Sequence, residues 1–207
     1  MNQFINSEAT VERNGKQYQV KLETQFPLNG IISITISGKD CSKVAIRHPA
    51  WSSGVKVKKN GREIFCERSE SGYILVDLDT QEINRIDLEF QMEPIVIAAN
   101  RKISYDARKA AIIMGPLLYC FESIDNGSEI EELGLYAQGE LETKRNSIAG
   151  KEINTIYAKG TRRRELEGDT LYGVYQEMKE DVKLTAIPYF LWNNRGEGEM
   201  KVWIPVE

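Results

Sequence analysis

The chain has 207 residues, of which 41% are hydrophobic and 28% are charged, and its formal net charge is −4. This composition is typical of a folded globular protein and excludes a disordered one, and the length permits one large β domain or two small ones. The negative balance argues against broad nucleic-acid binding, which usually requires a basic face. No apolar run is long enough to span a membrane, so we expect neither nucleic acid nor membrane as a partner.

The first half of the chain is patterned as a succession of hairpins. Asn-Gly, a dipeptide that suits type I′ turns because both residues tolerate positive φ, occurs at positions 14–15, 29–30, 60–61 and 126–127. The flanking residues alternate between apolar and polar side chains, most strictly in Ile32–Ile36. Strands are predicted at 9–12, 18–22, 32–36, 43–47, 55–58, 63–66, 73–78, 85–90 and 95–98. Short strands at this spacing predict an all-β fold built as a β-sandwich.

Ala111–Glu122 is the longest nearly unbroken apolar run in the chain. Gly115 and Pro116 divide it into two halves, each too short for an ordinary helix, and proline cannot donate a hydrogen bond to a ladder. We therefore predict a buried strand with a bend or bulge at Gly115 that continues as a second strand from Leu117. A run that is apolar on both faces should be covered on both, at a seam where sheets or domains meet.

The sequence after this run is harder to interpret. Residues 123–132 are polar and acidic, as in a surface loop, and 133–160 alternate only weakly. A helix over 129–141 is an alternative, although the glycines at 134 and 139 disfavour it. Strands are predicted at 171–175 and 182–191, with a closing strand at 200–204. We place a domain boundary near Arg108: a first β-sandwich comprises residues 1–108 with a closing strand from 198–207, and a second comprises 109–197.

No familiar catalytic pattern stands out. The single histidine, His48, precedes a proline beside Trp51 and has no partner nearby in sequence, so packing is favoured over a Ser-His-Asp or Cys-His role. The basic cluster at 162–164 lacks flanking aromatics, which favours a solvated strand end or a partner contact over a phosphate site. The carboxylates that could form a glycosidase pair lie on the polar phase of alternating strands, where solvation explains them: Asp77, Asp79, Asp87 and Glu89.

The cysteines and aromatic residues also favour packing roles. Cys41, Cys66 and Cys120 are widely spaced and odd in number, which fits neither a disulfide framework nor a Cys-x-x-Cys metal site. We expect buried thiols in a reducing compartment, and hence a cytoplasmic protein. Some aromatics could instead form a sugar-binding platform, but core or inter-domain packing is favoured for them: Trp51, Tyr189, Phe190, Trp192 and Trp203.

Several motifs occur together in a fixed order. Arg47–Trp51 resembles an Arg-Ile-Pro-x-Trp motif, with His48 in place of the usual aliphatic residue. Gly115–Glu122 resembles Gly-Pro-Leu-Val-Tyr-Cys-x-Glu and is followed by Asp125 and Asn126. A third stretch begins with Leu184–Tyr189 and continues through Trp192, Asn194, Arg195, Gly198, Met200, Val202 and Trp203. In this order, nearly the whole chain is similar to the C-terminal part of glycoside hydrolase family 127, the β-L-arabinofuranosidase family.

The resemblance implies two β-sandwiches, with the last strand returning to the first, that follow an (α/α)6 catalytic barrel outside this chain. In the family the barrel holds zinc, with a cysteine nucleophile and a ligand set that includes a Cys-Cys pair and a Glu-x-Cys. This sequence contains neither pattern, so no cofactor, metal or catalytic residue is expected in it. Because the chain opens within strand-like sequence at Phe4–Ser7, we interpret it as a fragment of a longer bacterial cytoplasmic enzyme.

Two functions from different classes follow. In the first, the chain is a non-catalytic accessory region that braces its own catalytic barrel, with homodimer formation as a further role. In the second, the sandwiches bind carbohydrate in their own right, with plant-type arabinose-containing glycans as ligands. The second function requires at least two aromatics exposed on one face, whereas the first buries them. A free-standing structural protein is a third option, which requires Met1 to be a true start.

The candidate contact residues are the same for both functions. They would touch either another domain or a sugar, and they are Trp51, His48, Tyr119, Tyr189, Trp192 and Arg195. We also predict that Arg47–Trp51 and Gly115–Tyr119 form a joint between domains.

Overall fold

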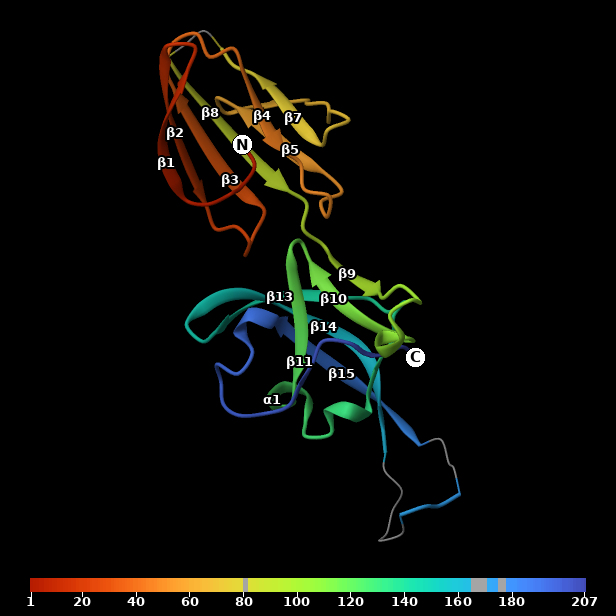
Figure 1. Cartoon of the computed structure of the whole chain (residues 1–207). Coiled ribbons are helices and arrows are strands. Elements are labelled where there is room, and N and C mark those ends of the chain that lie inside the picture. Colours follow the sequence, from red (N-terminus) through yellow and green to blue (C-terminus); the bar gives the residue numbers. More distant parts are fainter. Residues whose placement is uncertain (80–81, 165–170, 175–177) are drawn as a thin grey trace. The chain divides into compact units, whose positions relative to one another are not determined.

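A computed structural model describes residues 1–79, 82–164, 171–174 and 178–207. The chain forms two compact units, Met1–Met92 and Glu93–Glu207. Nearly all regular elements are strands, so the predicted all-β fold is confirmed (Figure 1). None of the helices in the described ranges is long and apolar enough to cross a membrane.

The first unit consists of a six-stranded and a two-stranded antiparallel sheet. The large sheet has the order β1 (Ser7–Arg13), β2 (Lys16–Thr24), β3 (Ile31–Ser37), β8 (Ile83–Phe90), β5 (Val55–Lys59) and β6 (Arg62–Ile64), and the small one pairs β4 (Lys43–Arg47) with β7 (Tyr73–Asp77). Asn14-Gly15 closes the β1–β2 hairpin and Asn60-Gly61 closes β5–β6, with positive φ at all four residues as predicted.

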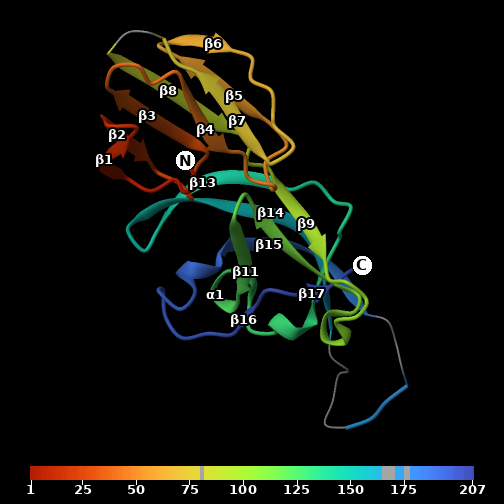
Figure 2. The same ribbon diagram turned by 45° about the horizontal axis from the view of Figure 1, so that its top comes forward.

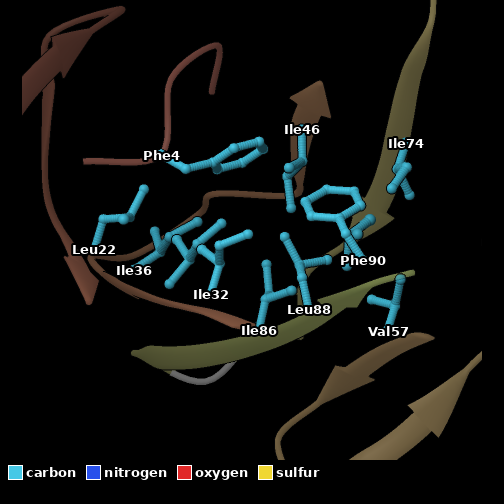
Figure 3. Packing of buried hydrophobic residues seen from close by; sticks show 12 residues of the cluster. Phe4, Leu22, Ile32, Ile36, Ile46, Val57, Ile74, Ile86, Leu88 and Phe90 are labelled. Carbon is cyan, nitrogen blue, oxygen red and sulfur yellow. The ribbon is translucent and has the colours of Figure 1, made fainter. Parts of the chain in front are cut away.

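The core of the first unit lies between the two sheets. The large sheet contributes alternate residues of β3 and β8, and the small sheet contributes Ile46, Ile74 and Val76. Figure 3 shows these side chains converging, with Phe4 closing the cluster from the segment before β1. Each buried isoleucine stabilises the fold by about 1.5–3 kcal/mol relative to an exposed one. Two sheets that share one apolar layer form the sandwich predicted for this part of the chain.

The second unit is built on a nine-stranded antiparallel sheet with short helices at its ends. Its elements are β9 (Pro94–Ala98), η1 (Ser104–Asp106), β10 (Lys109–Met114), β11 (Leu117–Glu122), α1 (Ser123–Asn126), η2 (Ile130–Glu132), β12 (Leu133–Leu135), β13 (Glu142–Ile148), β14 (Lys151–Arg163), β15 (Lys179–Pro188), η3 (Tyr189–Leu191), β16 (Met200–Lys201) and β17 (Ile204–Pro205). Figure 2 labels β16 and β17 within this unit.

Two features of the predicted domain organisation differ from the structure. The division falls after Met92, not near Arg108, because β9 forms a five-residue ladder with β10 and so belongs to the second unit. The closing segment does not return to the first unit either. β16 pairs with β11 and β17 pairs with β10, and the fully buried Ile204 anchors it there.

The apolar run Ala111–Glu122 forms a tight hairpin instead of a continuing strand. Met114 pairs with Leu117 in antiparallel register, so the chain reverses at Gly115 and Pro116. Gly115 has φ of +58°, and proline fixes φ near −65° at the next position, which is the pattern of a type II′ turn. The predicted second strand from Leu117 is confirmed as β11, but the bend or bulge predicted at Gly115 was wrong, because the chain reverses there. The expected coverage of both faces is confirmed in β10, where consecutive residues Ala110, Ala111 and Ile112 are all buried.

The part of the sequence that was hardest to interpret contains the longest strand, β14. Ala149 and Gly150 both have positive φ and close the β13–β14 hairpin. Gly160 lies so near the neighbouring strand that a Cβ would approach the Gly134 carbonyl oxygen to 2.1 Å, so only glycine fits. In place of the helix considered over 129–141, the structure has the single turn η2 followed by the strand β12.

The two strands predicted between residues 171 and 191 had different outcomes. The strand expected at 182–191 is present as β15, which begins at Lys179 and ends at Pro188, and η3 follows from Tyr189. The strand expected at 171–175 is not formed by residues 171–174, and Tyr175 lies outside the described residues.

Candidate functional site

Two of the sequence motifs meet around α1 in the second unit. β11 ends at Glu122 and leads directly into the single turn of α1, which Gly127 terminates with φ of +87°. The loop after η3 lies against this turn. The backbone N–H of Ser123 donates to the Glu199 carbonyl at 3.0 Å, and the N–H of Glu199 donates to Ser123 Oγ at 3.0 Å.

An ion cluster fixes the same loop. The Arg195 guanidinium contacts the carboxylates of both Glu122 and Asp125, with Nη1 lying 3.0 Å from Asp125 Oδ1. The backbone N–H of Asn193 donates to Glu122 Oε1 at 2.9 Å. Only 6% of the Glu122 side chain is exposed. Hydrogen bonding to Asp125 and then to Glu122 raises the pKa of Arg195 above its usual value, so the cluster keeps its positive centre.

The chemistry open to this cluster is limited. Both carboxylates are bound by Arg195, and Glu122 also accepts a backbone N–H. A general acid or base must present a carboxylate oxygen to the substrate, and here charge-assisted bonds to arginine engage both carboxylates. The arrangement therefore acts as a clamp that joins β11, α1 and the loop after η3.

Three aromatic side chains form an exposed surface next to the clamp, defined by Tyr189, Phe190 and Trp192. Their exposed fractions are 42%, 45% and 42%. The rings of Tyr189 and Trp192 stack at 6.2 Å between centroids with an interplanar angle of 19°. Lys151 Nζ lies 5.6 Å from the centre of the Phe190 ring. The structure thus brings three of the predicted contact residues, Tyr189, Trp192 and Arg195, into one region.

Tyr119 lies on β11 of the same unit but is not at the surface. It is 1% exposed, and its hydroxyl donates to the Asn154 carbonyl oxygen at 3.0 Å. Burial raises the pKa of this hydroxyl, which therefore stays protonated. Tyr119 is a packing residue within its own unit.

His48 and Trp51 belong to the other unit, where they extend its core. His48 is 8% exposed, its Nδ1 donates to the Pro49 carbonyl oxygen at 3.1 Å, and its ring meets Phe90 edge-on. Trp51 stacks on Phe26 and packs edge-on against Phe90. Burial, followed by the charge of Arg68, lowers the pKa of His48. The joint expected between Arg47–Trp51 and Gly115–Tyr119 stays a prediction.

The thiols do not suit a metal or a nucleophile. Cys41, Cys66 and Cys120 are free, and within the described ranges no group of three or more His, Cys, Asp or Glu side chains could hold a metal ion. Burial, then the nearby Glu122, raises the pKa of Cys120 to about 12, whereas both metal ligation and attack require a thiolate. The zinc implied by the resemblance does not fit the described residues.

Comparisons with known proteins agree with the motif order. Residues 1–92 match the family model for the β-L-arabinofuranosidase GH127 middle domain, and residues 94–205 match that for the glycoside hydrolase family 127 C-terminal domain. The chain belongs to glycoside hydrolase family 127. The border between the two matched regions coincides with the division of this family 127 chain into its two compact units.

The relatives are much longer than this family 127 chain. A non-reducing end β-L-arabinofuranosidase from Bifidobacterium longum is 28% identical over 198 residues, an alignment of 89% of this chain and 30% of that protein. The crystal structure of Ara127N-Se, a β-L-arabinofuranosidase from Geobacillus stearothermophilus T6, has a TM-score of 0.86 at 29% identity and covers 99% of this chain and 33% of its own. Another solved structure, described as a glycoside hydrolase, has a TM-score of 0.81 at 25% identity.

Sequence reasoning did not single out every residue of the site. Glu122 and Asp125 were part of a motif, but they lie about 70 positions from Arg195, and no local pattern links such distant residues. The position of Glu122 at the end of a buried strand could have indicated an ion pair, because a buried charge requires a partner.

Proposed function

We propose that this chain is a non-catalytic accessory region of a β-L-arabinofuranosidase-like hydrolase, in which it braces an (α/α)6 catalytic barrel that lies outside the chain. One observation carries the proposal: 99% of the chain matches about one third of an arabinofuranosidase, at a TM-score of 0.86. The catalytic region is then the partner, and the chain supplies two folded β units to support it.

The chemistry of the second unit supports this role. Its buried Glu122 and its partly exposed Asp125 are held by Arg195 and fasten a loop. Its buried thiol, Cys120, is held protonated. Groups arranged in this way rigidify a surface, which is what a bracing region requires.

Homodimer formation is part of the same proposal. β1 is an edge strand, and all seven of its residues are exposed. An exposed edge presents unpaired backbone groups to which another strand can add. Light scattering of the purified chain should give twice the monomer mass, and Thr10→Pro in β1, at a position whose N–H faces away from β2, should return it to the monomer. A monomeric wild-type chain would remove dimerisation from the proposal.

The accessory role is tested by moving the chain between enzymes. The purified chain should release no arabinose from a β-L-arabinofuranosyl disaccharide. Ara127N-Se should lose stability when its matching region is deleted, and should regain it when this chain is inserted in that place. A matched chimera that carries Arg195→Met should regain less. Hydrolysis by the chain alone, or full stability and activity of the deleted relative, would refute the bracing role.

Carbohydrate binding is the second candidate function, and the exposed aromatic surface favours it. The function requires at least two aromatics exposed on one face, and the exposed, mutually stacked rings of Tyr189 and Trp192 support it. Aromatic faces provide flat apolar area to a ligand while nearby polar groups fix its orientation. Calorimetric titration with L-arabinose, a β-L-arabinofuranosyl disaccharide and plant-wall oligosaccharides tests this function directly. Absence of binding by a folded sample would leave the accessory role alone.

A further inference from the structure

A groove crosses the second unit where β14 changes its partner strand. β12 pairs with β14 at residues 160–162 and β13 pairs with it at 151–157. The loop between them, 136–141, therefore passes over Ala158 and Lys159, and the Tyr136 N–H donates to the Lys159 carbonyl at 3.2 Å. The groove has a volume of about 620 Å³, which lies within the range of about 300–1,000 Å³ found for small-molecule sites.

The walls of the groove hold one another in position. The Tyr136 hydroxyl donates to Asp181 Oδ1 at 2.7 Å. Lys183 Nζ lies 4.1 Å from the centre of the Tyr157 ring and 3.8 Å from Glu142 Oε2. These residues come from the loop and from three strands, and cross-strand register brings them together. A site whose side chains already contact one another loses little conformational entropy when a ligand binds.

The charges of the walls indicate the class of ligand. Glu140, Glu142 and Asp181 line the groove together with Lys159 and Lys183. An anion would be repelled by the three carboxylates, and a cation would be repelled by the two ammonium groups. An apolar ligand would remove all five charges from water, at a high cost in desolvation free energy. A neutral molecule with many hydroxyls avoids each of these penalties. Its hydroxyls can donate to the carboxylates and accept from the lysines, and its C–H face can lie on a tyrosine ring.

We propose that this groove binds a neutral sugar, of the size of one or two rings, with Tyr136 and Tyr157 as its aromatic walls. The inference rests on the second candidate function, carbohydrate binding, and assigns it to a site. The surface formed by Tyr189 and Trp192 is the competing location. The groove differs from that surface because it combines tyrosine rings with carboxylates and ammonium groups in a concave site.

The experiment is a titration of the isotope-labelled full chain, followed by amide chemical shifts. The probes are L-arabinose and a β-L-arabinofuranosyl disaccharide, with galacturonic acid and glucosamine as the anionic and cationic comparisons. The proposal expects shifts at residues 136, 157 and 183 with the neutral probes and a millimolar Kd. Tyr157→Ala and Lys183→Met should each weaken binding about tenfold. Tyr157→Phe, which keeps the ring, should bind within about twofold of wild type.

Trp192→Ala tests the competing aromatic surface, and an unchanged Kd in this variant together with weaker binding by Tyr157→Ala would support the groove. Loss of binding in Trp192→Ala, with Tyr157→Ala unaffected, would overturn the groove while leaving carbohydrate binding intact. Binding of galacturonic acid or glucosamine alone would overturn the neutral ligand class. No shift with any probe would overturn both the groove and the second candidate function. Lys183→Met removes an ammonium group at the protein surface and should not affect folding. This variant therefore still tests the groove if Tyr157→Ala fails to fold.

Discussion

The side chain of Asn126 pairs with the backbone of Thr185 as a neighbouring strand would. Its Nδ2 donates to the Thr185 carbonyl at 2.9 Å, and its Oδ1 accepts the Thr185 N–H at 2.8 Å. Nδ2 also donates to the Glu122 carbonyl at 2.9 Å. Because Asn126 is 6% exposed, water cannot replace these bonds, and the pair fastens α1 to β15.

Replacement of Asn126 by alanine should therefore be costly. Loss of the carboxamide leaves the backbone groups of Thr185 and Glu122 without partners, which we expect to lower the free energy of unfolding by about 2–3 kcal/mol. Urea unfolding followed by circular dichroism measures the change. Asn194→Ala, which removes an exposed amide bonded to the Trp192 carbonyl, should cost less than about 0.5 kcal/mol. Equal effects of the two variants would contradict this role for Asn126.

Arg195→Met should destabilise the second unit more strongly. The change leaves Glu122, with a 6% exposed side chain, as a buried carboxylate without its counterion, at an expected cost of about 3 kcal/mol. Arg145→Met is the matched control, because Arg145 and Glu152 form an exposed pair at 3.9 Å that should contribute at most about 1 kcal/mol. Thermal unfolding of both variants tests the difference, and a small shift for Arg195→Met would refute the clamp.

His48 should make the first unit less stable in mild acid. Burial lowers its pKa in the folded state, so the unfolded chain binds a proton more readily than the folded one. The free energy of unfolding should therefore fall as pH drops below about 6.5, and should level off below the folded pKa. His48→Gln should weaken this dependence.

The His48 pKa can be measured directly, because this histidine is the only one in the chain. Its imidazole proton resonances should titrate with a midpoint below about 6.5, the usual value for histidine. A midpoint at or above that value would show that the ring is solvated or paired with a carboxylate, contrary to the packing against Phe90.

Cys120 should resist alkylation while the chain is folded. Its side chain is fully buried and its pKa is raised to about 12, so almost no thiolate is present at pH 8. Iodoacetamide followed by peptide mass spectrometry should label the partly exposed Cys41 in buffer and Cys120 only in denaturant. Comparable labelling of both in buffer would show that β11 opens readily.

Much of the fold could be predicted from local sequence because local chemistry determines it. Asn14-Gly15 and Asn60-Gly61 form the expected turns, since both residues accept the positive φ that the strand twist requires. The alternation in Ile32–Ile36 correctly gives the buried face of β3. Asn29-Gly30 did not follow the rule. It lies in the loop before β3, where Gly30 allows the Phe90 backbone to approach.

The candidate site was harder to predict from local sequence, because its residues are far apart in the chain. The contact residues predicted from the resemblance include Arg195, Tyr189 and Trp192, which do lie near one another. Glu122 and Asp125 were in a motif, but they were not predicted to bind Arg195. The groove residues Tyr136 and Tyr157 carry no local signal, since they lie outside regular alternation or on the polar phase of a strand. Only the pairing of β12 and β13 with the same strand brings them together.

The position of β11 has a consequence for how the second unit moves. β11 is hydrogen-bonded to β15 along one edge and to β10 and β16 along the other, so it cannot detach without breaking both ladders. Local openings should therefore begin at peripheral strands such as β16 and β17, and the β11 amides that are hydrogen-bonded to β15 should exchange with solvent only when the whole unit unfolds. Hydrogen exchange at these amides would then report the global stability of the second unit.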